Sequence, residues 1–125
     1  QGTGKGVFAV LTPESQKALL AAFPPVHPDV KAHHLTMAYD PEPVVLERFA
    51  RMEGQTIKMR VLGHAQDERG QAVAVYAPSM NLVPHVTISV ASGTEAVYSN
   101  ELLDRGWESA PRRLELEGVV TVEDL

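Results

Sequence analysis

Hydrophobic and polar positions repeat with two periods along the chain, and each period predicts a type of element. Short apolar runs, or runs that alternate apolar with polar residues, predict strands, whereas apolar residues three or four positions apart predict helices. The pattern predicts strands over residues 7–11, 32–39, 56–62, 71–77, 84–91 and 114–117. It predicts helices over residues 13–23, from about 43 to 53, and from 99 to 106. This order of elements favours an α+β fold with a mostly antiparallel sheet.

Capping residues and apolar stripes mark the helices. Thr12 supplies an N-cap hydroxyl, and Pro13 and Glu14 after it both suit a first helical turn. Prolines open the second helix, and Gly54 suits its C′ position. Ser99 is the predicted N-cap of the third helix. The apolar stripes expected to face the core are Ala18, Leu19, Ala22 and Phe23 in the first helix and Val45, Leu46, Phe49 and Met52 in the second.

Two neighbouring strands form a predicted hairpin across a polar turn. In the first of them Lys58 and Arg60 alternate with apolar residues, so this strand is expected to be half-buried. The second, residues 71–77, is apolar on both faces and should therefore be central in the sheet. In the last strand of the chain, Leu114 and Leu116 are expected to point inward.

The composition fits one globular domain over residues 1–125, with residues 1–6 as a flexible leader. Of the 125 residues, 44% are hydrophobic and 22% are charged, which is enough for a real core. The apolar runs are only a few residues long, so we expect neither a membrane span nor a signal peptide. We therefore expect a soluble protein. The lack of cysteine is compatible with a reducing compartment, and the expected location is intracellular, cytoplasmic or nuclear. Because the sequence begins Gln1-Gly2 without methionine, we also expect a module excised from a larger protein.

The charge and the cysteine content narrow the chemistry. A net charge of −5 provides no strong field for a long phosphate backbone, although a short or terminal phosphate can bind locally. The absence of cysteine excludes disulfides and thiolate catalysis.

Two four-residue stretches share the pattern of a histidine, an apolar residue, a threonine and a second apolar residue. They are His34-Leu35-Thr36-Met37 and His85-Val86-Thr87-Ile88, and they lie 51 positions apart in the sequence. Because side chains alternate between the two faces of a strand, each stretch presents an imidazole and a hydroxyl on one face and two apolar groups on the other. We expect the two strands to lie side by side around one cleft.

These side chains suit the hydrolysis of a phosphodiester. Histidine titrates near neutral pH, so one imidazole can act as the base while the other, protonated, acts as the acid. In an in-line displacement at phosphorus the attacking water and the leaving oxygen lie on opposite sides of the phosphorus atom. Two histidines on separate strands can reach these two sides. One such motif alone is more often a satisfied core histidine, whereas two copies in apolar strands favour catalysis. The predicted catalytic residues, which need no metal and no other cofactor, are His34 and His85 as acid and base, and Thr36 and Thr87 as donors to the phosphate oxygens.

The two motifs resemble the paired His-x-Thr-hydrophobic motifs of the 2H phosphoesterase superfamily. The stretches Asn81-Leu82-Val83-Pro84 and Ser99-Asn100-Glu101-Leu102-Leu103 are similar to the 2′,3′-cyclic phosphodiesterase domains of RNA-repair tRNA ligases. The resemblance implies a bilobal fold of mostly antiparallel sheets with flanking helices. In such a fold the histidines and threonines face each other across a central cleft.

The resemblance also implies an activity, the metal-independent opening of nucleoside or RNA-terminal 2′,3′-cyclic phosphates, commonly to a 2′-phosphate. One of His34 and His85 would activate water and the other would protonate the departing ribose oxygen, in an order that the sequence leaves open. The implied partners are RNA 3′ ends or short nucleotides that carry a cyclic phosphate, in RNA repair or tRNA splicing, with ligase or kinase domains linked to the chain. Because the chain is shorter than many members of the superfamily, short RNAs or single nucleotides are the favoured substrates.

Six further residues are candidates for substrate binding: Tyr39, Lys58, Arg60, Tyr76, Asn81 and Ser99. Lys58 and Arg60 would hold phosphate if their strand face lined the cleft, and otherwise they form a solvated face. Tyr39 and Tyr76 can stack on bases or belong to the core.

The other three histidines are not predicted to be catalytic. His33 would point away from His34 because the two are adjacent in a strand, and His27 and His64 fall in or near loops. Their spacing predicts no zinc site.

Two alternatives stay open. The first keeps the chemistry and changes the substrate to a 2′-5′-linked oligonucleotide or a cyclic dinucleotide. The second is a non-catalytic module that binds an RNA end, although such a module would be expected to have lost one of the four motif residues.

Overall fold

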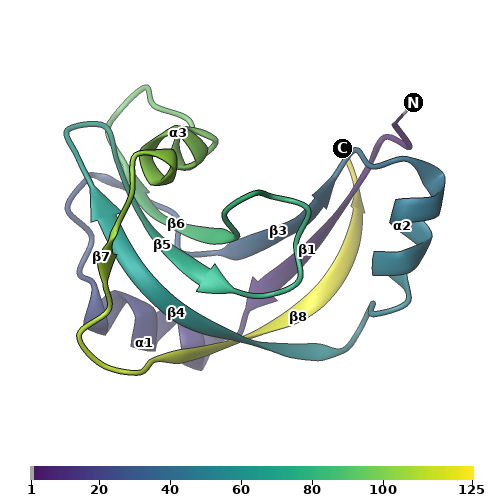
Figure 1. Ribbon diagram of the computed structural model, residues 1–125, viewed down its shortest axis with the longest axis horizontal. Coiled ribbons are helices and arrows are strands. Elements are labelled where there is room, and N and C mark those ends of the chain that lie inside the picture. Colours follow the sequence, from purple (N-terminus) through teal and green to yellow (C-terminus); the bar gives the residue numbers. More distant parts are fainter. Residues whose placement is uncertain (1) are drawn as a thin grey trace.

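The fold is described over residues 2–125 of a computed structural model (Figure 1). Three helices and eight strands occur in this part of the chain. In chain order they are β1 Lys5–Leu11, α1 Pro13–Ala22, β2 Asp29–Val30, β3 His34–Tyr39, α2 Pro43–Ala50, β4 Thr56–Gln66, β5 Gly70–Tyr76, β6 His85–Val90, α3 Tyr98–Asp104, β7 Glu108–Ser109 and β8 Glu115–Asp124.

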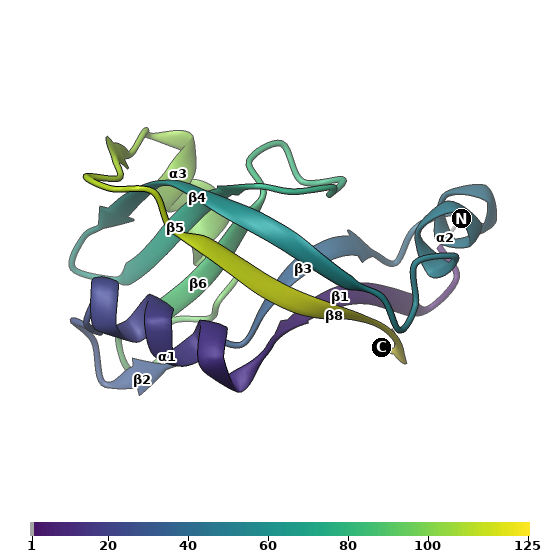
Figure 2. The same ribbon diagram turned by 90° about the horizontal axis from the view of Figure 1, so that it is seen from below.

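Six of the strands close into an antiparallel barrel. They pair in the order β6-β3-β1-β8-β4-β5, and β5 pairs with β6 to complete the ring. The two-residue strands β2 and β7, which the sequence pattern did not predict, pair with β6 and β4. The long strands β4 and β8 run side by side, antiparallel, along one side of the barrel (Figure 2). The fold is therefore α+β with an antiparallel sheet, as predicted.

Apolar side chains fill the interior of the barrel. Those that are fully buried there include Leu35, Met37, Met59, Ile88 and Leu116. Burying each side chain of this size stabilises the fold by roughly 1.5–3 kcal/mol. Because side chains alternate along a strand, the residues between them point to the outer face of the barrel.

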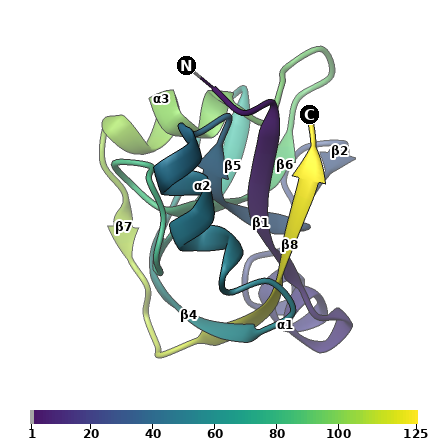
Figure 3. The ribbon, with the colours of Figure 1, turned by 90° about the vertical axis from the view of Figure 1, so that its right-hand side faces the viewer.

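The helices cover different parts of the barrel. α2 lies across one end (Figure 3), where Leu46, Phe49 and Met52 pack against the core. α1 contacts β8 and β1 and buries Leu19 completely. α3 contacts β5 and β4 and buries Leu103. No helix within residues 2–125 is long and apolar enough to cross a membrane.

The prediction for α1 is confirmed at its start and in half of its apolar stripe, because Leu19 is fully buried and Phe23 packs against the core. Thr12 is the N-cap, and its Oγ1 accepts a hydrogen bond from the backbone N of Ser15 at 3.2 Å. Ala18 and Ala22 are exposed, whereas Ser15 and Leu19 are buried. The Ser15 hydroxyl accepts a hydrogen bond from the backbone N of Glu117, at 2.7 Å, which ties the Ser15 side of the helix to β8.

Two further local predictions differ from the structure. Ser99 is not an N-cap: α3 begins at Tyr98, and Ser99 lies buried in its first turn. The predicted flexible leader is tethered over its described part, because Thr3 donates from its backbone N and its hydroxyl to the carbonyl of Pro41, at 3.1 and 2.9 Å. Gly4 N donates to Asp40 Oδ1 at 2.8 Å, and β1 already begins at the next residue. Gln1 lies outside the described residues.

Candidate active site

The two motif strands are direct neighbours in the barrel. β3 and β6 pair antiparallel, with Leu35 opposite Val86. Both of these side chains are fully buried in the barrel core. The residues on either side of them therefore project from the outer face, where the same register sets His34 opposite Thr87 and His85 opposite Thr36. Each imidazole thus lies across the strands from the hydroxyl of the other motif.

All four motif residues line one cleft of about 830 Å³ on this outer face. Its apolar wall is formed by Phe8, Tyr39, Ala96 and Val97. The remaining lining residues are polar or charged, and they are Lys31, His33, Asn81, Glu95 and Asn100. A space of this volume is typical of a site for one small ligand.

His85 is held in one orientation by the backbone. Its Nδ1–H donates to the carbonyl oxygen of Val83 at 2.9 Å, so Nε2 is the nitrogen left for proton transfer. Burial lowers the pKa of His85 below the ordinary value of 6.5, and the bond to the Val83 carbonyl acts in the opposite direction. Neutral His85 can accept a proton at Nε2, and the protonated form can donate it from the same atom.

His34 is fixed by side chains. Its Nδ1 lies 3.0 Å from Nδ1 of His33, so one of these two nitrogens carries the shared proton. Its ring also meets the ring of Phe8 edge-on, with the centroids 5.0 Å apart. The pKa of His34 is lowered from 6.5, first by burial and then by the charge of His33, with a further contribution from His85. Glu123 partly offsets this decrease of the pKa.

The two threonines differ in how they are held. Thr87 is buried, and its Oγ1 lies 2.8 Å from Oγ of Ser99 and donates to the carbonyl of Ala96 at 3.3 Å. Thr36 is half-buried, and its hydroxyl has no partner among the described residues. The hydroxyl of Thr36 can therefore turn to a ligand directly, whereas that of Thr87 is already oriented by α3.

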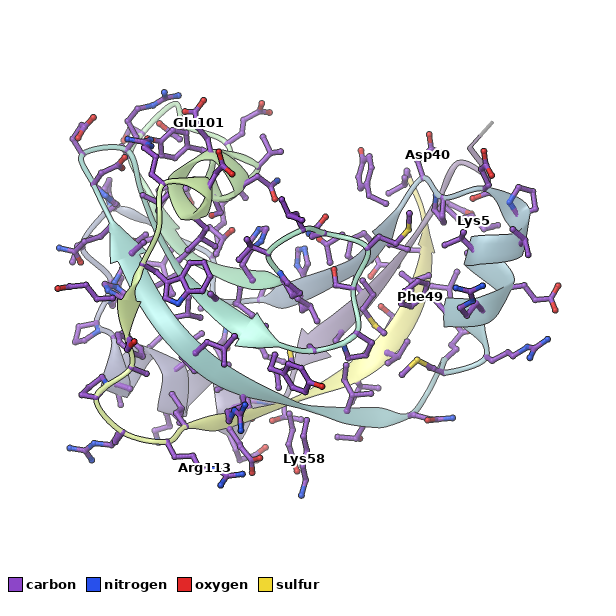
Figure 4. All side chains as sticks on the ribbon, viewed as in Figure 1. Lys5, Asp40, Phe49, Lys58, Glu101 and Arg113 are labelled. Atoms are coloured by element: carbon purple, nitrogen blue, oxygen red, sulfur yellow. The ribbon has the colours of Figure 1, made fainter. Side chains whose placement is uncertain are left out.

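The substrate-binding candidates divide into those that reach the cleft and those that do not. Tyr39 and Asn81 line it, and Ser99 lies behind Thr87. Lys58, Arg60 and Tyr76 do not line it: Figure 4 shows Lys58 at the lower edge of the barrel, pointing away from the strands. Arg60 packs over the ring of Tyr76, 5.7 Å from its centroid. Strand alternation gave the correct exposed face for Lys58 and Arg60, but it cannot tell which side of a closed barrel carries the cleft.

Sequence reasoning placed His33 on the wrong face. It precedes the first residue of β3 and lines the cleft beside His34. The alternation of a regular strand does not apply to it, because Ala32 adopts a positive φ of 46° and the regular strand β3 begins only at His34. Phe8, Lys31 and Glu95 also line the cleft, and no pattern in the sequence marks them as site residues.

A second cleft, of about 590 Å³, lies at the C-terminal end of α3 and contains none of the motif residues. Beside it the Tyr98 hydroxyl donates to Asp67 Oδ2 at 2.5 Å, and Arg105 donates to the Tyr98 oxygen at 2.6 Å. These bonds anchor α3 to the turn between β4 and β5. They therefore fix the helix that carries Ser99.

Within residues 2–125 no three or more His, Asp or Glu side chains are grouped so that they could hold a metal ion. His27 Nε2 bonds the carbonyl of Asp67 at 2.8 Å, and His64 stacks on Phe23 with the ring centroids 4.7 Å apart. Neither lines the cleft that contains His33.

The fold and the site together define a closed antiparallel barrel with a two-histidine, two-threonine cleft on its outer face. A scan against protein-family models and a search of curated proteins give no match for this chain. The interpretation of the cleft therefore comes from its geometry and its motifs.

Proposed function

We propose that the protein is a phosphodiesterase of the 2H phosphoesterase type, which opens the 2′,3′-cyclic phosphate of a nucleotide or of an RNA 3′ end. The observation that carries the proposal is the register of β3 and β6, which sets two imidazoles and two threonine hydroxyls on one face of adjacent strands. This set contains a base, an acid and two hydrogen-bond donors for phosphate oxygens.

In the proposed mechanism His34 is the base and His85 is the acid. The charges of His33 and His85 oppose a proton on His34, whereas the Val83 carbonyl stabilises the proton on His85. His34 removes a proton from water, and the water oxygen forms a bond to phosphorus. The bond between phosphorus and the ribose 3′ oxygen breaks, and His85 donates its proton to that oxygen. The products are a 2′-phosphate and a 3′-hydroxyl.

The two threonines would stabilise the charge that spreads over the other phosphate oxygens. Thr36 donates directly, because its hydroxyl has no competing partner among the described residues. Thr87 donates after its hydroxyl turns from the Ala96 carbonyl, a bond of 3.3 Å that is already long. Ser99 then donates to Thr87 from behind, which keeps the Thr87 oxygen in place.

The size and charge of the cleft support a short substrate. A volume of about 830 Å³ suits a nucleotide. Among the described residues Lys31 is the only lysine or arginine that lines the cleft, and it already pairs with Asp29 at 3.3 Å. A long RNA backbone normally requires several cations along its path, so a nucleotide or the last residues of an RNA fit this cleft better.

Several finer statements belong to the same proposal. The paired motifs support membership of the 2H superfamily, and the two-lobed arrangement typical of that family stays a prediction. An intracellular role in RNA repair, with ligase or kinase domains linked to this one, also stays a prediction.

The first experiment is hydrolysis of nucleoside 2′,3′-cyclic monophosphates and of an RNA that ends in a cyclic phosphate, in EDTA. The variants are His34→Ala and His85→Ala, and His27→Ala serves as a control because His27 lies outside the cleft. We expect turnover by the unchanged protein and by the control, and its loss in both cleft variants. Turnover that survives in either cleft variant would contradict the proposal.

The assignment of acid and base has its own test. A phosphodiester with a p-nitrophenolate leaving group needs no proton on the departing oxygen. His85→Ala should therefore retain activity on this substrate, whereas His34→Ala should not. The opposite result would exchange the two roles.

One observation favours a second candidate substrate. Besides the four motif residues, the cleft is lined by Tyr39, which follows Thr36 along β3, and by Lys31, which precedes His34 in the chain. A 2′-5′-linked or cyclic dinucleotide would reach both residues, so these compounds belong in the same assay. If nothing is hydrolysed, a non-catalytic module that binds RNA ends becomes the better interpretation.

A further inference from the structure

The two ends of the cleft differ in chemistry. At the Thr36 end lie Tyr39 and Asn81, beside a loop that is held to β3 by the bond from Met80 N to Met37 O, 2.8 Å long. At the Thr87 end the segment before α3 closes over the strand, because Thr87 Oγ1 bonds the carbonyl of Ala96. Glu95, the neighbour of Ala96, therefore belongs to the Thr87 end.

Glu95 is the one carboxylate among the described residues that line the cleft. It is exposed, and its side chain forms no ion pair or hydrogen bond with another described residue. A carboxylate opposes the binding of a phosphate anion in the same cleft, since like charges repel. Its favourable partners on a nucleotide are the neutral hydrogen-bond donors.

The proposed substrate has few hydrogen-bond donors that could bind to Glu95. In a nucleoside 2′,3′-cyclic phosphate both of these ribose oxygens are esterified, so the ring hydroxyls are unavailable as donors. The base is then the main source of N–H groups. Guanine places N1–H and the 2-amino group side by side, which matches the two oxygens of a carboxylate, whereas the other three bases lack two adjacent donor groups on this edge.

The neighbours of Glu95 suit the same ligand. Val97 lines the cleft and is 67% exposed, which leaves an apolar surface against which the face of a base can lie. Asn100 donates from Nδ2 to the carbonyl of Val97 at 3.3 Å, so its Oδ1 is available as a further acceptor. This end of the cleft thus offers acceptors beside an apolar wall.

We propose that Glu95 selects a guanine base, by accepting hydrogen bonds from N1–H and the 2-amino group of a guanosine 2′,3′-cyclic phosphate. The inference rests on the proposed function and names its substrate class. Glu95 is a specificity residue that contacts the base and takes no part in the proton transfers.

The test compares kcat/KM for the guanosine, adenosine, cytidine and uridine 2′,3′-cyclic monophosphates. The variant is Glu95→Gln, which keeps the size of the side chain but replaces one acceptor by a donor. The control is Glu101→Gln: Glu101 lies on the outer side of α3 (Figure 4) and does not line the cleft. We expect a preference for guanosine of roughly tenfold, in line with one bidentate contact to a base. Glu95→Gln should reduce it to within about threefold, and Glu101→Gln should leave it unchanged.

The outcomes separate this inference from the proposed function. Equal turnover of all four nucleotides, or a guanosine preference that persists in Glu95→Gln, overturns the role of Glu95 and leaves the phosphodiesterase intact. If no nucleotide is hydrolysed, the proposed function fails, and calorimetry with guanosine and adenosine 2′-monophosphates decides the inference. Tighter binding of the guanosine compound that is lost in Glu95→Gln supports it, and equal binding overturns it.

Discussion

The hydrogen bond between Ser99 and Thr87 links α3 to the chemistry of the cleft, and removing it tests the site directly. The two hydroxyl oxygens are 2.8 Å apart, and both side chains are nearly buried, with 1% of Ser99 and 9% of Thr87 exposed. In Ser99→Ala, Thr87 keeps only the 3.3 Å bond to the Ala96 carbonyl. That bond directs the Thr87 proton away from the substrate.

The size of the effect follows from the energy of one buried hydrogen bond. Such a bond contributes about 1 kcal/mol, which corresponds to about a fivefold change in rate if the loss falls on the transition state. In the proposed mechanism Thr87 donates mainly to the charge that develops during reaction, so we expect kcat to fall about fivefold in Ser99→Ala, with little change in KM. The free energy of unfolding should fall by about 1 kcal/mol for the same reason.

The assay measures kcat and KM for Ser99→Ala, Thr87→Val and the double variant. If Ser99 acts through Thr87, the double variant should be no slower than Thr87→Val alone. Ser15→Ala is the matched control, because Ser15 is also buried and hydrogen-bonded, at 2.7 Å to Glu117 N, but lies outside the cleft. Ser15→Ala should lose stability without losing kcat. Equal losses of kcat in Ser15→Ala and Ser99→Ala, or full additivity of Ser99→Ala with Thr87→Val, would refute the positioning role.

Four other predictions follow from the described contacts. Because the pKa values of His34 and His85 are both lowered from 6.5, kcat/KM should peak below pH 6.5: at higher pH the acid loses its proton, and at lower pH the base gains one. Because both pKa values are lowered in the folded state, the unfolded chain binds more protons than the folded one in this range. The free energy of unfolding should therefore fall as pH decreases through 6.5 and level off below the folded pKa values. Urea titrations at several pH values measure this dependence, and a flat dependence contradicts the prediction. Met59→Ala, on β4 in the fully buried core, should lower the free energy of unfolding by about 2–5 kcal/mol but leave kcat of the folded protein within about twofold, as checked by denaturation and kinetics on one sample. Lys58→Gln and Arg60→Gln should each change kcat/KM by less than about twofold, because neither residue lines the cleft, and a larger loss would show that substrate reaches β4.

The four motif residues could be predicted from the sequence because their placement depends on one local rule. Alternation along a strand fixes His34 and Thr36 on one face and Leu35 on the other, and the same holds for the second motif. The prediction that the two motif strands lie side by side depended only on the pattern that they share. The register that aligns them was not predictable, because it depends on contacts between residues 51 positions apart.

The parts that escaped prediction depend on non-local pairing or on local irregularity. Closure of the barrel requires β1 to pair with β8, which lies at the opposite end of the chain. The sequence pattern of neither strand predicts this pairing. His33 was misplaced because the chain turns at Ala32. Glu95 and Lys31 lie in segments with no regular period, so only the three-dimensional arrangement brings them to the cleft.

The Leu35–Val86 pair has a consequence for how the cleft can evolve. A single inserted residue in either motif strand would turn an imidazole and a hydroxyl into the apolar interior and expose the groups that belong there. Selection for a folded protein alone would eliminate such insertions, whether or not the protein is active. A descendant in which one histidine was substituted would therefore still hold the other three groups in place, and one reverse substitution would be enough to restore the set of four.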